Sequence, residues 1–270
     1  MPELAEVEYY RKQWDPGLGQ VVRRVAIHDR ARIFRETSPN LLRRRLPGRH
    51  FEGSEAHGKN LLFRFSDGAW VGGHLGMTGK THVAPPDFEP GKHDHLVIYL
   101  ESLALVFTDP RLFGRIRFEL VDPGPPDWWS ELPPAVLDPG FSRDRVAEFA
   151  RRRRRTPVKT LLLDQAVFPG IGNWMADEIC WRLRWHPGRP AGTLDEAEAD
   201  HLRRETRHVS RKALEIIGQD WGAPPKSWLF RHRWKDGGHC PRRGCGEALV
   251  RADLRGRTTC WCPRCQGEET

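Results

Sequence analysis

Long hydrophobic runs are missing from this chain of 270 residues. No stretch of about eighteen apolar residues occurs, which excludes a membrane-spanning helix of the usual kind. The N-terminus lacks the apolar segment of a secretory signal and instead carries glutamates at positions 3, 6 and 8. We therefore expect a globular, cytoplasmic protein that does not associate with membranes.

Cysteine is scarce over most of the chain, because only Cys180 precedes a cluster of five that lies between Cys240 and Cys265. In the absence of a secretory signal, such a cluster favours metal binding in a reducing compartment over disulfide bonds. Cys180 stands alone within ADEICWRL, and we interpret it as a buried thiol of the core.

Acidic residues are outnumbered, with 36 Asp and Glu against 44 Lys and Arg, and the net charge is +8. A positive field of this size suits a polyanion such as nucleic acid. Net charge alone does not identify the partner, because many other soluble proteins are also basic.

The hydrophobic period changes along the chain and predicts its domains. Residues 3–14 have the spacing of a helix, whereas short strand-like runs fill residues 20–120 and suggest a β-sandwich or barrel. These runs are VVRRVAIHD, LLFRFSDG, WVGGHLG, HLVIYLESLALVFTDP and RIRFEL. We predict a β-sandwich domain over residues 1–121 and a proline-rich linker over residues 122–138.

Beyond the linker the pattern becomes helical. We predict a helical domain over residues 139–225, with Ser142 and Thr193 as N-caps and Gly218 at the end of the last long helix. Residues 226–270 contain few aliphatic side chains and cannot build a core without a staple. They are predicted to form a third, cysteine-rich domain.

That staple is predicted to be one structural Zn²⁺ ion. Cys240 and Cys245 have four residues between them, and Cys262 and Cys265 have two. Two close thiolate pairs joined by a short hairpin fit tetrahedral zinc. Cys260 is an alternative to Cys262, although in a strand-like approach its side chain is expected to point elsewhere.

A glycine turn in FPGIGNWMADEI separates two predicted helices. Gly170 and Gly172 bracket one residue, and Asn173 follows as a candidate cap. Turns of this kind present backbone N–H groups to DNA phosphates, where they supply position rather than sequence recognition. Packing between two helices can also require glycine, so the turn alone does not decide its role.

The first residues, MPELAEVE, allow two interpretations. Proline is suited to the first turn of a helix, and Glu3 and Glu6 would then lie near the positive end of the helix dipole. Alternatively, removal of Met1 would expose a reactive secondary amine at Pro2. The rest of the chain has to decide between them.

Three segments together resemble the formamidopyrimidine-DNA glycosylase and endonuclease VIII family of base-excision repair enzymes. They are PELAEVE, DQAVFPGIGNWMADEI and GRTTCWCPRCQ, and the pieces HGKNLLF, GGHLGMTGK and TDPRLFGRIRF agree with them in order. The resemblance spans the whole chain. It implies an α+β multidomain fold, in which an N-terminal helix on a β-sandwich is followed by a helix–two-turn–helix domain and a zinc-finger hairpin. Damaged duplex DNA is expected in the cleft between the halves.

The resemblance implies a catalytic group of three residues. Pro2 is implied as the nucleophile that forms a Schiff base with the opened sugar, Glu3 as the neighbouring acid/base, and Lys59 as a phosphate-binding lysine near the active site. An α-amino group has a reference pKa of about 8, against about 10.4 for lysine. A larger fraction of the α-amino group is therefore neutral and nucleophilic at pH 7. β-Elimination and then δ-elimination are expected to follow base loss, in a protein that acts as a monomer and joins the nucleoid when bound to DNA.

Five further residues are implied in DNA contact. The everted base leaves a gap that large side chains fill, and the phosphates beside the lesion are held by polar ones. The gap-filling set is Met77, Arg111 and Phe113, and the phosphate-holding set is Asn173 and Arg257. Core packing is the alternative for Met77, but its position between glycines in HLGMTG indicates an exposed turn.

The chain departs from the family pattern in four places, of which Ala5, where many relatives have a second proline, should matter little. Leu112 stands where many relatives carry arginine, and the first cysteine pair has a wider spacer. The segment between Gly218 and Cys240 is short and carries Trp221, Trp228 and Trp234, which weakens the case for 8-oxoguanine as the preferred lesion. Oxidised pyrimidines, ring-opened formamidopyrimidines and further-oxidised guanines then fit better.

Two other functions compete with a bifunctional glycosylase and abasic-site lyase. The same scaffold in a non-catalytic DNA-binding protein would not need Pro2, Glu3 and Lys59 together. A zinc-ribbon protein that binds partners through its tail would leave the N-terminal motif unexplained. The run of five arginines at residues 151–155 either adds non-specific DNA affinity or is a solvated face.

Overall fold

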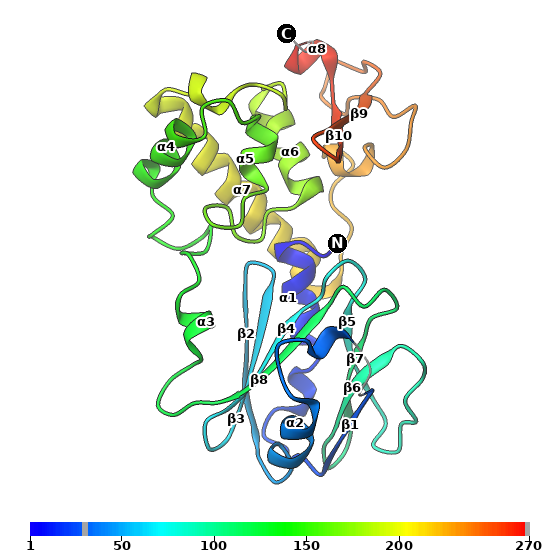
Figure 1. Cartoon of the computed structure of the whole chain (residues 1–270). Helices are drawn as coiled ribbons and strands as arrows, with labels where there is room; N and C mark the ends of the chain where they lie inside the picture. The colour runs from blue at the N-terminus through cyan, green and yellow to red at the C-terminus, as the bar shows by residue number, and fades with distance from the viewer. Residues whose placement is uncertain (29–31, 268–270) are drawn as a thin grey trace. The chain divides into compact units, whose positions relative to one another are not determined.

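The computed structural model of the chain describes residues 1–28 and 32–267 (Figure 1). Two compact units divide the chain. The first unit holds residues 1–2 and 6–132, and the second holds residues 3–5 and 133–270. The segment predicted as a linker contains a short helix, α3 (Asp127–Ser130). The domain boundaries proposed from the sequence stay a prediction.

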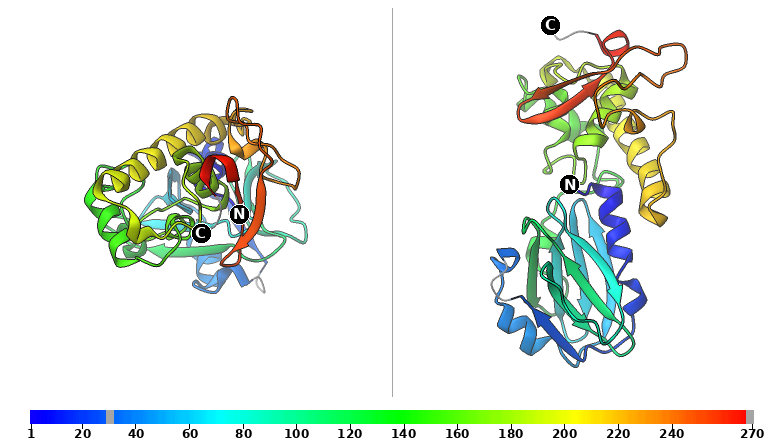
Figure 2. Two further views of the ribbon diagram at one scale, coloured as in Figure 1. Left: turned by 90° about the horizontal axis from the view of Figure 1, so that it is seen from above. Right: turned by 90° about the vertical axis from the view of Figure 1, so that its right-hand side faces the viewer.

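The first unit is a sandwich of two four-stranded antiparallel sheets, which can be followed in Figures 1 and 2. One sheet has the order β2-β3-β4-β8 and the other β1-β6-β7-β5. The strands of the first sheet are Phe51–His57, Asn60–Phe65, Ala69–His74 and Arg115–Leu120. Those of the second are Arg24–Ile27, Asp94–Tyr99, Ala104–Thr108 and Lys80–Ala84.

Aromatic side chains fill the core of this sandwich. Trp14 is fully buried, and its ring centre lies 4.3 Å from the ring centre of Phe63. The Phe63 ring in turn contacts the ring of Phe51. The β-sandwich that the sequence predicted is confirmed. Strands β2 and β5 and the helix α2 (Pro39–Arg45) were not predicted, because each carries mostly polar side chains and only one fully buried residue.

The second unit is built around a buried helix, α6 (Asn173–Leu183), of which nine of the eleven residues are buried. Three other helices accompany it, namely α4 (Arg143–Arg152), α5 (Val158–Leu162) and α7 (Glu196–Asp220). Since α6 is enclosed on all sides, its polar residues need partners inside the protein. Cys180 is buried in this core, as predicted.

The helix ends were predicted with mixed success. The Ser142 side chain accepts a hydrogen bond from the Arg145 backbone N–H and caps α4, as expected. Thr193 is not the cap of α7, because Asp195 and Glu198 form a capping box two residues later. Gly218 does not end α7 either. It is buried within the helix, which continues to Asp220 and ends at Trp221 in the left-handed conformation.

The C-terminal segment of the second unit forms a β-hairpin and a short helix. Strands β9 (Val250–Leu254) and β10 (Arg257–Trp261) pair antiparallel, and α8 spans Pro263–Gln266. A small cluster of buried side chains, with Trp181 and Leu229 among the cysteines, supports the hairpin. Within the described part of the chain, no helix combines the length and apolarity needed to cross a membrane.

Candidate functional site

The Glu3 side chain caps the N-terminus of α6. Its carboxylate accepts hydrogen bonds from the backbone N–H groups of Gly172, Trp174 and Met175, at 3.0, 2.9 and 3.1 Å. Glu3 is only 2% exposed, so these donors replace water around the carboxylate. A negative charge at a helix N-terminus is stabilised both by the orphan N–H groups and by the helix dipole.

The glycine turn makes room for this carboxylate. A Cβ atom on Gly172 would lie 2.3 Å from the Glu3 side-chain carboxyl carbon, which no real side chain tolerates. The carbonyl of Gly170, whose φ is +89°, accepts a hydrogen bond from the Leu4 N–H at 3.0 Å. The sequence left open whether the turn binds phosphate or only allows two helices to pack, and in the structure three N–H groups in and just after it bind Glu3.

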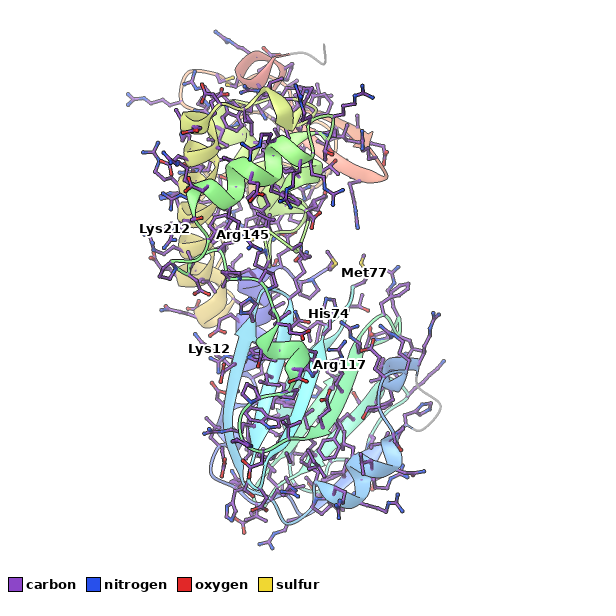
Figure 3. The ribbon with its side chains drawn as sticks, turned by 60° about the vertical axis from the view of Figure 1, so that its left-hand side comes forward. Lys12, His74, Met77, Arg117, Arg145 and Lys212 are labelled. Atoms are coloured by element: carbon purple, nitrogen blue, oxygen red, sulfur yellow. The ribbon has the colours of Figure 1, made fainter. Side chains whose placement is uncertain are left out.

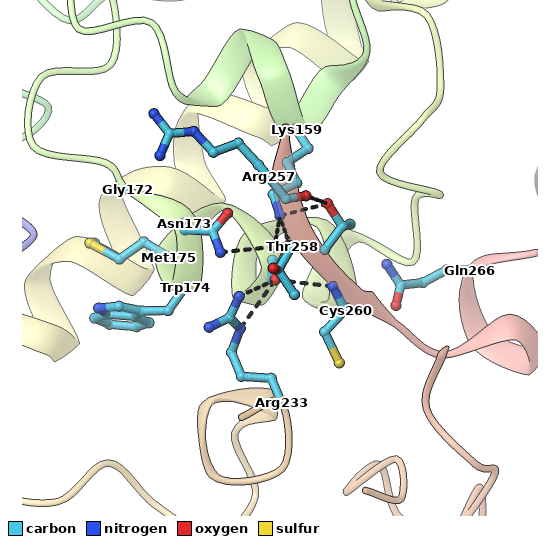
Figure 4. Close-up of polar contacts among 12 residues, drawn as sticks. Lys159, Gly172, Asn173, Trp174, Met175, Arg233, Arg257, Thr258, Cys260 and Gln266 are labelled. Carbon is cyan, nitrogen blue, oxygen red and sulfur yellow. Dashed lines mark hydrogen bonds and ion pairs between the residues drawn. The ribbon is translucent and has the colours of Figure 1, made fainter. Parts of the chain in front are cut away.

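Asn173 lies beside the start of β10 (Figure 4). Its side-chain Nδ2 donates a hydrogen bond to the Thr258 carbonyl at 2.8 Å. Arg257, the residue before Thr258, is exposed. The structure therefore brings together the two residues predicted to hold phosphates. Asn173 is not the cap of α6, since Gly172 occupies that position.

Lys59 lies in the turn between β2 and β3 and is 7% exposed. Its neighbour His74, at the end of β4, was not predicted as a site residue. Burial, with a smaller effect from the cations Arg115, Lys59 and Arg35, lowers the pKa of His74 to about 4. At neutral pH the ring is uncharged, which agrees with its Nδ1 accepting a hydrogen bond from the Gly76 N–H at 3.0 Å.

The loop residues predicted to fill the gap in DNA are exposed in the first unit. Met77 is 36% exposed and Phe113 is 52% exposed, and the Arg111 guanidinium lies 4.9 Å from the Phe113 ring centre. The exposed turn predicted for Met77 is confirmed (Figure 3). Leu112, which departs from the family pattern, adopts a positive φ of 56° between Arg111 and Phe113.

A buried carboxylate ties the two loops together. Asp109 accepts hydrogen bonds from the Thr78 hydroxyl at 2.7 Å and from the backbone N–H groups of Arg111 and Gly114 at 3.2 and 2.7 Å. A Cβ atom on Gly76 would lie 2.4 Å from the Phe113 carbonyl carbon, so the loops pack backbone to backbone. Asp109 lies within the segment TDPRLFGRIRF, but the sequence did not reveal its role, because its partner Thr78 lies 31 residues away.

The sulfur atoms of Cys240, Cys245, Cys262 and Cys265 all lie within 4.8 Å of one another. Neighbouring sulfurs are 3.5 to 4.0 Å apart, close to the spacing of about 3.8 Å that four zinc–sulfur bonds of about 2.3 Å require in a tetrahedron. The donor set therefore fits a tetrahedral metal ion. Cys260 lies outside the set, and its backbone N–H binds Asp177 at 3.1 Å.

Comparisons with known proteins agree with this arrangement. Two family models match, the formamidopyrimidine-DNA glycosylase N-terminal domain over residues 1–116 and the H2TH domain of the same enzyme over residues 132–221. The chain is 38% identical to a formamidopyrimidine-DNA glycosylase of Thermus thermophilus, in an alignment 289 positions long that covers 99% of each protein.

Solved structures give the same result. A Lactococcus lactis formamidopyrimidine-DNA glycosylase, bound non-covalently to DNA that contains an abasic site, matches with a TM-score of 0.86 and 27% identity over 98% of this chain and 100% of that one. A MutM protein in complex with DNA that contains carbocyclic 8-oxo-G matches with a TM-score of 0.87 and 27% identity over 99% and 100%. The chain thus belongs to the formamidopyrimidine-DNA glycosylase family of base-excision repair enzymes.

Proposed function

We propose that this protein is a bifunctional DNA glycosylase and abasic-site lyase that removes oxidised or ring-opened bases from duplex DNA. The observation that carries the proposal is the position of Glu3, whose buried carboxylate is held at the N-terminus of α6 directly after Pro2. Because the proposed nucleophile and the proposed acid/base group are adjacent in the chain, they stay close to each other and to the same reacting sugar. We propose that the protein acts as a monomer in the cytoplasm and at the nucleoid.

Pro2 is the proposed nucleophile once Met1 has been removed, because the peptide bond to Met1 otherwise occupies its nitrogen. The free amine attacks C1′ of the damaged nucleoside, and the bond from C1′ to the base breaks. Opening of the C1′–O4′ bond, with a proton delivered to O4′, then gives an iminium ion. Loss of a C2′ proton expels the 3′ phosphate, a second elimination expels the 5′ phosphate, and water releases the sugar remnant from Pro2.

Glu3 is the proposed proton donor to O4′ and acceptor of the proton in return. The carboxylate first takes the proton that the Pro2 amine loses on attack, and it then delivers this proton to O4′. Lys59 is proposed to bind a phosphate next to the reacting sugar, beside an uncharged His74 that adds no competing charge. Burial keeps the Lys59 side chain from swinging freely, which reduces the entropy lost when it binds.

DNA contacts are proposed for the residues inferred from the family. Asn173 and Arg257, which lie next to each other, are proposed to hold phosphates. Met77, Arg111 and Phe113 are proposed to occupy the gap after base eversion. The exposed apolar side chains of Met77 and Phe113 would offset the cost of unstacking, and Arg111 would hydrogen-bond the orphan base. The domains are proposed to be 1–121 for the catalytic sandwich, 139–225 for the H2TH domain and 226–270 for the zinc finger, with 122–138 as the linker.

Zinc is the proposed metal of the cysteine site. Four thiolates at tetrahedral spacing suit Zn²⁺, and a fully thiolate-ligated ion leaves no open position for a substrate. When bound, the ion supplies structure rather than reaction chemistry. Cys240, Cys245, Cys262 and Cys265 would hold it, and Trp181 Nε1 donates a hydrogen bond to the Cys240 sulfur at 3.3 Å.

We propose that ring-opened formamidopyrimidines and oxidised pyrimidines are better substrates than 8-oxoguanine, although one related MutM protein was solved with 8-oxo-G DNA. The proposal rests on the short segment between Gly218 and Cys240, which contains only the short helix η4 (Leu229–Arg231) after the end of α7. It exposes Trp221 and Trp234, at 48% and 55%.

The proposal is tested with end-labelled duplexes that carry one formamidopyrimidine, one oxidised pyrimidine, one 8-oxoguanine or no lesion. The expected result is base release and strand cleavage at a formamidopyrimidine or oxidised pyrimidine, with phosphate at both ends of a one-nucleotide gap. Tight binding of lesion DNA without base release or cleavage would instead identify a non-catalytic DNA-binding protein. Faster cleavage at 8-oxoguanine would overturn only the lesion preference.

A further inference from the structure

Lys159, on α5, is a buried lysine whose ammonium group lies among three oxygen atoms of the protein. Its Nζ atom lies 2.8 Å from the Asp177 carboxylate, 2.8 Å from the Thr258 carbonyl and 2.8 Å from the Thr259 hydroxyl. The Thr258 carbonyl and the Thr259 hydroxyl accept hydrogen bonds from the ammonium group, and Asp177 forms an ion pair with it. With the side chain only 1% exposed, Lys159 acts on other parts of the protein and does not reach a ligand (Figure 4).

Asp177 is the centre of a buried charge cluster that joins α6 to the hairpin. Its Oδ2 atom accepts hydrogen bonds from Arg233 Nε at 3.1 Å, Arg233 Nη2 at 2.5 Å and the Cys260 backbone N–H at 3.1 Å. Two cations thus share one carboxylate that is fully buried. Loss of Lys159 alone would still leave Asp177 paired with Arg233.

The Thr259 hydroxyl passes this anchoring on to Arg257. While it accepts from Lys159, it donates to the Arg257 carbonyl at 2.9 Å. The next carbonyl, that of Thr258, accepts from both Lys159 and Asn173 at 2.8 Å. Every residue from Arg257 to Cys260 is therefore held by a group from α5 or α6, directly or through Thr259.

Such anchoring matters because a two-stranded hairpin has little stability of its own. Arg257 is exposed and follows a turn in which Arg255 and Gly256 both have positive φ, at 52° and 77°. Without a fixed backbone, a long arginine side chain on such a turn would sample many orientations, and binding a phosphate would cost more entropy.

We propose that Lys159, Asp177 and Thr259 are positioning residues that fix the backbone of Arg257, so that its guanidinium and the Asn173 amide meet DNA phosphates in one orientation. The inference rests on the proposed DNA-binding function. It assigns Lys159 an indirect role, through the chain of hydrogen bonds from its Nζ to the Arg257 carbonyl.

The test compares Thr259→Val, which keeps the shape but removes the hydroxyl, with Thr259→Ser, which keeps the hydroxyl. Affinity is measured for a duplex that contains a tetrahydrofuran abasic-site analogue. Thr259→Val and Arg257→Ala are each expected to weaken binding about tenfold, and the double variant no further. Thr259→Ser should bind as the wild type does. Wild-type affinity in Thr259→Val, or losses that add up in the double variant, would overturn the proposal.

A second measurement needs no DNA. Amide hydrogen exchange over residues 257–261 of the full, metal-loaded protein is expected to accelerate in Thr259→Val and Lys159→Met but not in Thr259→Ser, with metal content unchanged. Unchanged exchange in both of the first two variants would refute the anchoring. If the wild type binds none of the duplexes, the proposed function fails, and hydrogen exchange still decides the positioning role.

Discussion

Glu3 has one task that the structure shows and a second that we propose. Its side chain caps α6, and as the neighbour of Pro2 it is proposed to exchange a proton with the sugar. The cap stabilises the buried carboxylate, because three backbone N–H groups donate hydrogen bonds to it. The glycine at position 172 is the space that this arrangement needs.

We predict that Glu3→Gln loosens the start of α6. An amide offers one acceptor oxygen where the carboxylate offers two, and its NH₂ group would face a backbone N–H. The free energy of local opening at the start of α6 should fall by about 2 kcal/mol. Hydrogen exchange at the amides of Gly172, Trp174 and Met175 should then be about 30-fold faster. Hydrogen exchange followed by NMR measures this directly. The control Glu6→Gln, in the first turn of α1 (Leu4–Lys12), should leave these amides unchanged. If these three amides exchanged at the same rate in both variants, Glu3 would not act as the cap of α6.

His74 gives a prediction about pH. Its pKa is about 4 in the folded protein and about 6.5 in an unfolded chain, so the unfolded state binds the proton first as the pH falls. The protein should lose up to about 3 kcal/mol of stability from this group between pH 6.5 and pH 4, and no more below that range. Urea unfolding of the wild type and of His74→Gln at pH 7, 5.5 and 4 measures the difference. Parallel pH profiles would contradict it.

At the residue scale, motif and chemistry predicted the exposed Met77 turn and the four-cysteine set. They did not reveal His74, Asp109, Lys159 or Asp177. These residues act through partners that folding brings from distant segments, such as the Thr78 partner of Asp109 and the Thr259 partner of Lys159. A single sequence carries no periodic or spacing signal for such contacts.

At the element scale, hydrophobic period predicted the sandwich and the long helices but not every boundary. Strand β2, FEGSEAH, has a polar face and one fully buried residue, so its alternation is weak. Helix α7 begins at a capping box that Thr193 partly obscured, since Thr193 lies in the 3₁₀ turn just before it. Gly218 looked like a helix end but is an interior residue in a packed face.

The hairpin and the cysteine site form one element whose order should depend on the metal. We predict one zinc ion per chain, which Cys245→Ser or Cys265→Ser should lose, while the neighbouring Cys260→Ala should keep it because its sulfur lies outside the set. Elemental analysis of the purified variants measures the content. A full complement in Cys265→Ser, or loss in Cys260→Ala, would show that the ligand set is wrong. Chelation of the metal should also weaken binding to duplex DNA.

At the scale of the whole molecule, the positive charge should govern DNA affinity. Arginines 151–155 are all exposed, as predicted for a run of like charges. Arg152 pairs with Glu148, whereas no acidic partner is found for Arg154 and Arg155 among the described residues. Arg153 also pairs with Asp164, at 3.8 Å, so Arg154 and Arg155 are the members of the run that can contribute most readily to phosphate binding.

We predict that the double replacement Arg154→Ser and Arg155→Ser weakens binding to undamaged duplex DNA and makes it less dependent on salt. The slope of log affinity against log salt should fall by about 1 to 2. Titrations at several salt concentrations give the slope. The control Arg23→Ser removes an exposed arginine that already pairs with Glu101, and it should change little. An unchanged slope in the double variant would leave the run as a solvated face.

The proposed function depends on attack of the Pro2 amine on the sugar, and borohydride trapping detects the covalent product of that attack. Protein shown by mass spectrometry to lack Met1 is mixed with duplex DNA that contains an abasic site, and the iminium is reduced. We expect a stable protein–DNA adduct, which peptide mapping should place on Pro2. No adduct, or an adduct on a lysine such as Lys59, would contradict it.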